Sequence, residues 1–220
     1  MSDLLRQWVR ESHRIVFFGG AGVSTESGIP DFRGVDGLYR QKYAYPPEMI
    51  LSHSFFASRP EEFFRFYRDK ILITDAKPNP AHGKLAQWEA EGRLQAVITQ
   101  NIDGLHQMAG SKNVLELHGS IHRNYCASCG KKYPLETVSQ AQGIPRCQCG
   151  GIIRPDVVLY EEPLDDVIIS KTPCCKQLID QYEEYGLGCV CMREVPFEQV
   201  SRYSSMKVSL LHDNVYRISD

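Results

Sequence analysis

Short apolar runs alternate with helical segments along the first three quarters of the chain. Residues 15–18 form an apolar, β-prone run that two glycines end, and residues 96–99, 114–117 and 157–160 show the same pattern. Short apolar runs bounded by turn residues predict buried strands. Because helical segments separate these strands, the pattern predicts an α/β fold with a doubly wound, Rossmann-like and mainly parallel sheet.

Helical spacing marks three segments. Apolar residues recur at this spacing over residues 3–12, and a further helix is predicted over residues 82–91. Residues 46–72 are rich in aromatic residues at helical spacing, and Pro60 predicts that a new helix begins at the following residue. The chain therefore carries a small helical module in addition to the sheet.

Composition narrows the class of protein. The chain has 220 residues, of which 42% are apolar and 24% are charged, and its formal net charge is −2. This size and apolar content suit one globular domain. The small net charge gives no electrostatic reason to expect nucleic acid or an anionic membrane as a partner. No apolar stretch reaches the roughly 18 residues of a membrane span, and the run at residues 15–18 is too short for a signal peptide. We expect a cytoplasmic protein, and the oligomeric state stays open.

Eight cysteines in a reducing compartment suggest metal ligands or free thiols before disulfides. Cys126 and Cys129 are followed, after 17 residues, by Cys147 and Cys149, and both pairs lie near glycine-containing turns. Four thiolates suit a tetrahedral zinc ion and leave no position open for water. We therefore expect one structural zinc ion in a zinc-ribbon module. The alternative is four buried free cysteines.

A glycine-rich loop follows the first predicted strand. Gly20, Ala21 and Gly22 allow backbone N–H groups to approach a pyrophosphate at the start of a helix. The dinucleotide fingerprint has a third glycine where this chain has Thr25. Taken alone, the loop is equally compatible with a plain tight turn.

The longer segment changes this interpretation. Residues 20–34 read GAGVSTESGIPDFRG and resemble the signature of the sirtuin family, the NAD-dependent protein-lysine deacylases, in a bacterial form. Three further segments match the family in its order: residues 99–106 (TQNIDGLH), 117–120 (LHGS) and 154–162 (RPDVVLYEE). The resemblance covers about residues 1–166. It implies a single catalytic domain over residues 1–220, with a Rossmann-like NAD-binding part (1–40, 78–122, 152–166), a helical module (41–77), a zinc module (123–151) and an atypical tail (167–220).

The resemblance also implies residue roles. His118 follows a predicted strand and is the expected catalytic base, and imidazole titrates near pH 6.5, about where such a base must work. Asn101 and Asp103 are expected to orient water and ribose. Val157 and Val158 are expected to pair with the substrate peptide, although a core strand would look similar. The expected NAD-binding residues are Gly20, Ala21, Gly22, Thr25, Asp31, Phe32, Arg33, Tyr39, Gln100, Asn101 and Asp103.

The implied chemistry transfers an acyl group from lysine to ADP-ribose. Nicotinamide leaves the C1′ carbon of NAD, and the acyl oxygen of an acylated lysine attacks there to give an alkylimidate. His118 then removes a proton from the ribose diol, which attacks the imidate. The products are lysine, nicotinamide and O-acyl-ADP-ribose, and the expected partners are acylated-lysine proteins. No tyrosine–arginine pair for acidic acyl groups is evident, and Tyr43 and Tyr45 do not supply one, so acetyl is the expected group.

The tail does not continue the family pattern. The expected helix, the strand ending in Gly-Thr-Ser and the strand with an asparagine are missing after residue 166. We hypothesise an out-of-frame or otherwise altered end that starts between Val167 and Pro173. Residues 188–192 and 207–211 are candidate substitute strands. A second zinc site is disfavoured, because adjacent cysteines cannot readily chelate one ion tetrahedrally; the tail cysteines are Cys174, Cys175, Cys189 and Cys191.

This tail keeps alternatives to an active deacylase open. One is a catalytically inactive remnant that binds zinc and ADP-ribose or a peptide. Another is transfer of ADP-ribose to protein, which shares the first chemical step and which nothing in the sequence favours.

Overall fold

The computed structural model of the protein describes residues 9–12, 15–31, 43–170, 207–212 and 215–219. The chain divides into two compact units, one of Ser12–Thr172 and one of Met1–Glu11 with Pro173–Asp220. In the second unit, residues 9–11 are helical, as predicted; residues 3–8 of that predicted helix lie outside the described residues, and Ser12 is not helical.

The second unit also contains an antiparallel hairpin. Strand β7 (Lys207–His212) pairs with β8 (Val215–Ser219). Residues 207–211 therefore form a strand, as the sequence suggests, and the strand pairs within the tail. Residues 188–192 lie outside the described part of the chain.

A parallel sheet forms the centre of the unit Ser12–Thr172. It consists of β1 (Ile15–Gly19), β2 (Leu94–Thr99) and β3 (Val114–Glu116) in the order β1-β2-β3. Both pairings are parallel, which confirms the three predicted strands and the fold class. Five of the six β2 residues are buried, as expected for a strand covered on both faces. Helix α5 (Pro80–Ala90) packs on this sheet through Leu85.

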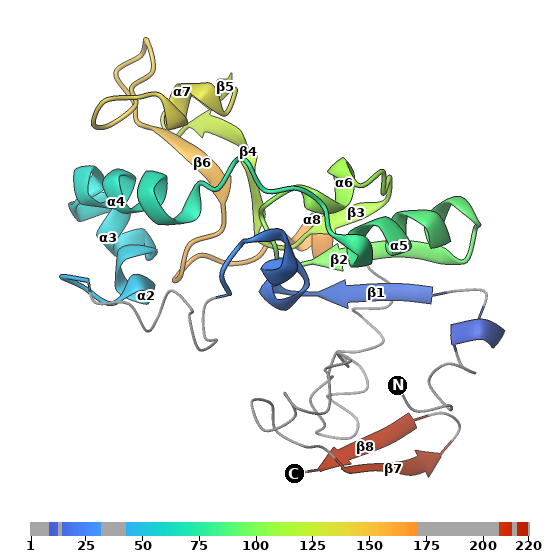
Figure 1. Ribbon diagram of the computed structural model, residues 1–220. Helices are drawn as coiled ribbons and strands as arrows, with labels where there is room; N and C mark the ends of the chain where they lie inside the picture. The colour runs from blue at the N-terminus through green and yellow to red at the C-terminus, as the bar shows by residue number, and fades with distance from the viewer. Residues whose placement is uncertain (1–8, 13–14, 32–42, 171–206, 213–214, 220) are drawn as a thin grey trace. The chain divides into compact units, whose positions relative to one another are not determined.

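A second, antiparallel sheet has the order β5-β4-β6, with β4 (Gly119–Cys126) in the middle (Figure 1). Its neighbours are β5 (Lys132–Tyr133) and β6 (Ile153–Val157), and the short helix α7 (Glu136–Ser139) lies between them in the chain. This sheet carries the predicted zinc module.

The predicted strand at residues 157–160 is wrong. The strand is β6, which ends at Val157 and runs antiparallel to β4. Beyond it, the Val158 N–H donates to the His118 carbonyl and the Leu159 N–H donates to the Glu162 carboxylate. The Tyr160 N–H donates to the Leu51 carbonyl in an isolated bridge, so the run after Val157 forms separate contacts and no continuous strand ladder.

The helical module agrees with the predicted segment. It contains α2 (Pro47–Ile50), α3 (His53–Ser58), α4 (Pro60–Phe66) and a π-helical turn, η3 (Tyr67–Ile71). Pro60 is itself the first residue of α4, where its missing N–H costs no hydrogen bond. Aromatic side chains of this module share one buried core with Ile121, Val138 and Ile153 of the antiparallel-sheet part, and the two parts lie side by side in Figure 1.

We expect Phe63→Ala to lower the free energy of unfolding by about 3–5 kcal/mol, because it leaves a cavity in this core. Phe63 is fully buried and its ring contacts Phe56, Phe64 and Tyr67. Urea denaturation followed by circular dichroism measures the change. Met49→Ala removes an exposed apolar side chain from the same module and should change stability by less than about 0.5 kcal/mol. Equal losses in both variants would contradict the assigned core.

Candidate active site

A cavity of about 670 Å³ opens within the unit Ser12–Thr172. The loops after β1, β2, β3 and β6 line it together with the end of the helical module. The predicted site residues in its lining are Ala21, Gly22, Asp31, Gln100, Asn101, Asp103, His118, Val157 and Val158. Gly20 and Thr25 belong to the same glycine loop but do not line the cavity. Phe32, Arg33 and Tyr39 lie outside the described residues.

Strand register explains why these residues meet. Gly19 at the end of β1 pairs with Thr99 at the end of β2, and Thr99 pairs with Glu116 at the end of β3. The three loops that follow therefore leave the sheet at the same edge. This edge, at the carboxyl ends of parallel strands, is where open α/β sheets bind ligands.

The glycine loop leads directly into a short helix. Gly20 precedes a 3₁₀ helix, η1 (Ala21–Ser27), and a Cβ at Gly20 would lie 3.2 Å from the Gln100 side-chain oxygen. The Thr25 hydroxyl donates to the carbonyl of Gly22 at 3.0 Å. Thr25, which replaces the third glycine of the dinucleotide fingerprint, thus stabilises the conformation of the loop with its own hydroxyl.

A hydrogen-bonded chain joins the loops after β1 and β2. The Asn101 side-chain N–H donates to the Ser24 hydroxyl at 2.9 Å, and that hydroxyl donates to the Asp103 carboxylate at 2.7 Å. Ser24 is fully buried. Sequence reasoning missed this residue, because the loop contains several hydroxyl residues and nothing in the pattern distinguishes Ser24. The chain fixes the orientation of both predicted polar residues.

His118 is half-buried at the wall of the cavity. Its Nδ1 lies 3.0 Å from the backbone oxygen of Gln100. A carbonyl only accepts, so Nδ1 carries the proton, and in the neutral ring Nε2 is left as the acceptor. The next residue, Gly119, has φ of +78°, and a Cβ there would overlap the Asp156 carbonyl. The backbone thus holds the imidazole in the tautomer that a general base needs.

Two other histidines lie nearby but do not line the cavity. His82 and His106 are buried with ring centroids 4.6 Å apart. Burial lowers the pKa of His106 to about 4, and the neighbouring His82 adds to this effect. Burial also lowers the pKa of His82. Among the described residues, His118 is the histidine in the cavity lining.

The carboxylate of Glu162 anchors the segment after β6. Glu162 accepts hydrogen bonds from the guanidinium of Arg154 at 2.6 and 2.9 Å and from the Leu159 N–H at 2.9 Å. Arg154 also donates to the carbonyl of Val157 at 3.0 Å. Partial burial raises the pKa of Glu162, but the hydrogen bonds from Arg154, the Leu159 N–H and His53 outweigh it and hold the pKa at about 2.

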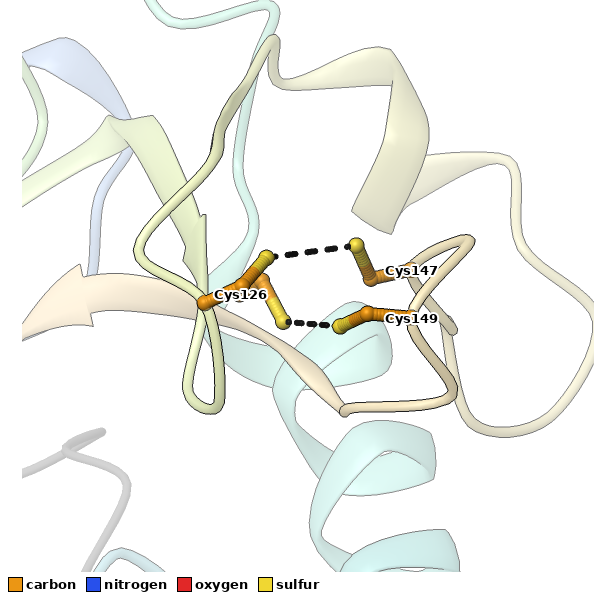
Figure 2. A group of neighbouring side chains, drawn as sticks. Cys126, Cys147 and Cys149 are labelled. Carbon is orange, nitrogen blue, oxygen red and sulfur yellow. Dashed lines mark hydrogen bonds between the residues drawn. The ribbon is translucent and has the colours of Figure 1, made fainter.

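The four predicted cysteines lie together, and Figure 2 shows Cys126, Cys147 and Cys149 of this group at one end of the antiparallel sheet. All four sulfur atoms lie within 4.8 Å of one another, with Cys126–Cys149 at 3.5 Å and Cys129–Cys147 at 3.6 Å. Tetrahedral zinc with Zn–S bonds of about 2.3 Å requires sulfur atoms about 3.8 Å apart. The four cysteines are therefore positioned to bind one zinc ion. The predicted exclusion of a tail zinc site concerns residues outside the described part.

Electrostatics around the sulfurs favour a cation. The backbone N–H of Cys149 and then the Tyr133 hydroxyl lower the pKa of Cys147 to about 6. The backbone N–H of Gly151 lowers the pKa of Cys149, but the neighbouring sulfurs outweigh it and raise the pKa to about 12. Four sulfurs this close become thiolates together when a metal ion neutralises them.

These features define a class: an α/β protein with a nucleotide-type cavity and a separate four-cysteine metal site. The chain belongs to the Sir2 family, whose model matches residues 20–180, as the motifs predict. The NAD-dependent protein deacetylase of Clostridium acetobutylicum is 62% identical over 172 residues, which cover 76% of this chain and 70% of that protein. The NAD-dependent protein deacetylase of Listeria innocua is 39% identical over 215 residues, which cover 98% of this chain and 90% of that protein.

Solved Sir2 structures show the same fold. A Sir2 histidine variant with deacetylated p53 peptide and 3′-O-acetyl-ADP-ribose has a TM-score of 0.71 at 43% identity, covering 77% of this chain and 69% of that chain. A Sir2 complex with p53 peptide and NAD⁺ has a TM-score of 0.67 at 43% identity, covering 78% and 69%.

The family match extends past residue 166, where the motif resemblance stops, and it ends at residue 180. The Listeria alignment continues over nearly the whole chain. The altered reading frame stays a hypothesis. In the part of the chain that the structure describes, each helix is too short or too polar to cross a membrane.

We expect the purified protein to contain one zinc ion per chain and Cys147→Ser to contain far less, because three thiolates and a neutral hydroxyl bind zinc weakly. Atomic absorption measures the stoichiometry. Cys189→Ser is the matched control outside the ligand set and should keep one zinc ion. Two ions per chain, or full occupancy in Cys147→Ser, would contradict the assigned site.

Stability should depend on Glu162 at acid pH. Its pKa in the folded state, about 2, lies below the ordinary value of 4.5, so its contribution is present above pH 4.5 and is lost as the pH falls toward 2. The free energy of unfolding of Glu162→Gln should therefore fall less steeply over that range than that of the wild type. Denaturant titrations at several pH values test this. The exposed Glu136→Gln should parallel the wild type; identical slopes for Glu162→Gln and wild type would refute the prediction.

Proposed function

We propose that this protein is an NAD-dependent protein deacetylase that moves an acetyl group from a protein lysine to ADP-ribose and releases nicotinamide. The observation that carries the proposal is one cavity that brings together the glycine loop, the Asn101–Ser24–Asp103 chain, His118 and the Val157–Val158 segment. The names of the curated relatives and the ligands of the solved Sir2 complexes support the same activity.

NAD is the proposed cosubstrate, and its pyrophosphate would lie against the backbone of Ala21 and Gly22 at the start of η1. Gln100, Asn101 and Asp103 would surround the nicotinamide and its ribose. Ser24 holds the side chains of Asn101 and Asp103 in place, so they do not have to reorganise when NAD binds. Thr25, Asp31, Phe32, Arg33 and Tyr39 remain predicted members of the loop that closes over NAD.

His118 is the proposed general base. Its Nδ1–H is committed to the Gln100 carbonyl, so Nε2 is the atom that takes the proton from the ribose diol. Departure of nicotinamide supplies an electrophilic carbon that the weakly nucleophilic amide oxygen attacks. The deprotonated ribose oxygen then attacks the resulting imidate. One imidazole thus serves the second half of the reaction.

The proposed substrates are acylated-lysine proteins. Val157 and Val158 lie in the cavity wall and are proposed to pair with the backbone of an extended peptide. Ile102, Ile121 and Leu159 also line the cavity, which favours a short neutral acyl group such as acetyl. Four cysteine thiols gathered as metal ligands support a reducing compartment, and we propose the cytoplasm.

A second candidate is binding of NAD or ADP-ribose without turnover. It rests on the parallel sheet: among the described strands, β1 stands at the end of the order β1-β2-β3. In a doubly wound sheet the strand before the glycine loop normally has strands on both sides. A cofactor site open on that side would bind the nucleotide without holding it for reaction.

Nicotinamide release from NAD with and without an acetyl-lysine peptide tests both candidates. We expect release that depends on the peptide, and His118→Ala should lower formation of deacetylated peptide by at least about 100-fold, the usual contribution of a general base. Zinc content and cooperative melting serve as controls for folding. No release from a folded, zinc-containing protein would contradict the deacetylase and favour the binding function.

A further inference from the structure

Strand β4 contains a bulge between Ser120 and Asn124, close to the candidate base. Gly119 pairs with Val157 and Ser120 with Asp156, but the next pair is Asn124 with Pro155. Residues 121–123 of β4 therefore have no pairing partner in β6. Bulges next to active sites redirect side chains.

The last residue of this bulge, Arg123, bridges two carboxylates. Its Nε donates to Asp156 at 2.8 Å, and its Nη1 donates to Glu116. The Glu116 carboxylate is buried and also accepts from the Gln107 side chain at 2.9 Å. Arginine suits this position because its planar guanidinium presents donors in fixed directions.

The two carboxylates flank the reactive segments. Glu116 ends β3 two residues before His118, and Asp156 directly precedes Val157. The Val158 N–H donates to the His118 carbonyl at 3.0 Å, so the two segments also touch each other. Arg123 thus spans the junction between the base and the peptide segment without lining the cavity.

We propose that Arg123 is a positioning residue for deacetylation, which fixes His118 relative to the peptide segment Val157–Val158 through Glu116 and Asp156. This inference rests on the proposed function. Arg123 acts through the backbone of β4 and β6, on both sides of the point where Gly119 lies close to the Asp156 carbonyl. It does not itself touch the reacting groups. Small displacements of a catalytic group are costly, and about 1 Å can lower a rate by about 100-fold.

The order of the chemical steps gives this role a distinctive signature. Loss of nicotinamide and attack by the acyl oxygen precede the proton transfer to His118. Exchange of labelled nicotinamide into NAD, which reports the reversible first step, therefore does not need the base. A displaced His118 lowers product formation and spares exchange, whereas general destabilisation lowers both together.

The experiment compares Arg123→Lys and Arg123→Met with wild type for peptide deacetylation and nicotinamide exchange. We expect kcat for deacetylation to fall by about 10- to 100-fold in Arg123→Met. Arg123→Lys should recover only part of the loss, because an ammonium is a single point donor. The rate of nicotinamide exchange should change by less than about 2-fold in both variants. Arg65→Met, an exposed arginine of α4 outside the cavity lining, should leave both rates unchanged.

Hydrogen exchange at backbone amides provides a readout that does not need activity. In Arg123→Met the Val158 amide should exchange at least about 10-fold faster, while the Ala127 amide, bonded to Ile152 in the zinc module, should keep its wild-type rate. A wild type without deacetylation or nicotinamide exchange would defeat the proposed function, and the amide rates alone would then test whether Arg123 holds the two segments together. Equal amide rates, or a proportional fall in deacetylation and nicotinamide exchange, would overturn the role of Arg123.

Discussion

The close approach of Gly119 to the Asp156 carbonyl is the contact on which the site depends. At this point the parallel sheet ends and the antiparallel sheet begins, because β3 leads through Leu117 and His118 directly into β4. Any side chain at residue 119 would push β4 and β6 apart. The His118 carbonyl would then lose the Val158 N–H, and the base and the peptide segment would separate. One glycine therefore sets the distance between two proposed functional elements.

Polar groups around this junction form hydrogen bonds with one another. Ser24 joins Asn101 to Asp103, Arg154 joins Glu162 to the Val157 carbonyl, and Arg123 joins Glu116 to Asp156. The Ser24 bridge and the Arg123–Asp156 pair connect segments far apart in the chain, whereas Arg154 ties down its own segment. Paired charges and hydroxyls are tolerated in such positions because every partner retains a hydrogen bond. These hydrogen bonds orient the polar groups in advance, which is what electrostatic catalysis requires.

The zinc site is connected to the cavity through the packing of a shared core. Cys126 and Cys147 belong to the same buried core as Phe63, Phe64 and Tyr67 of the helical module. Tyr67 and Ile121 are part of that core and also line the cavity. A zinc ion bound by the four cysteines would thus stabilise a wall of the cavity from a distance. This is the expected behaviour of a closed four-thiolate site with no position for substrate.

The sequence by itself determined the family, the three parallel strands, the helical module and the four zinc ligands. These features depend on local patterns: apolar runs, helical spacing, and cysteine pairs at turns. Only the tertiary structure decided the partners of Ser24 and Arg123 and the true direction of the strand before Val158. A hydroxyl or a guanidinium looks alike at any position in the chain, and its role depends on which distant carboxylate the fold brings within hydrogen-bonding distance. The apolar run at residues 157–160 reported burial, whereas strand pairing depends on backbone groups that the pattern of side chains does not reveal.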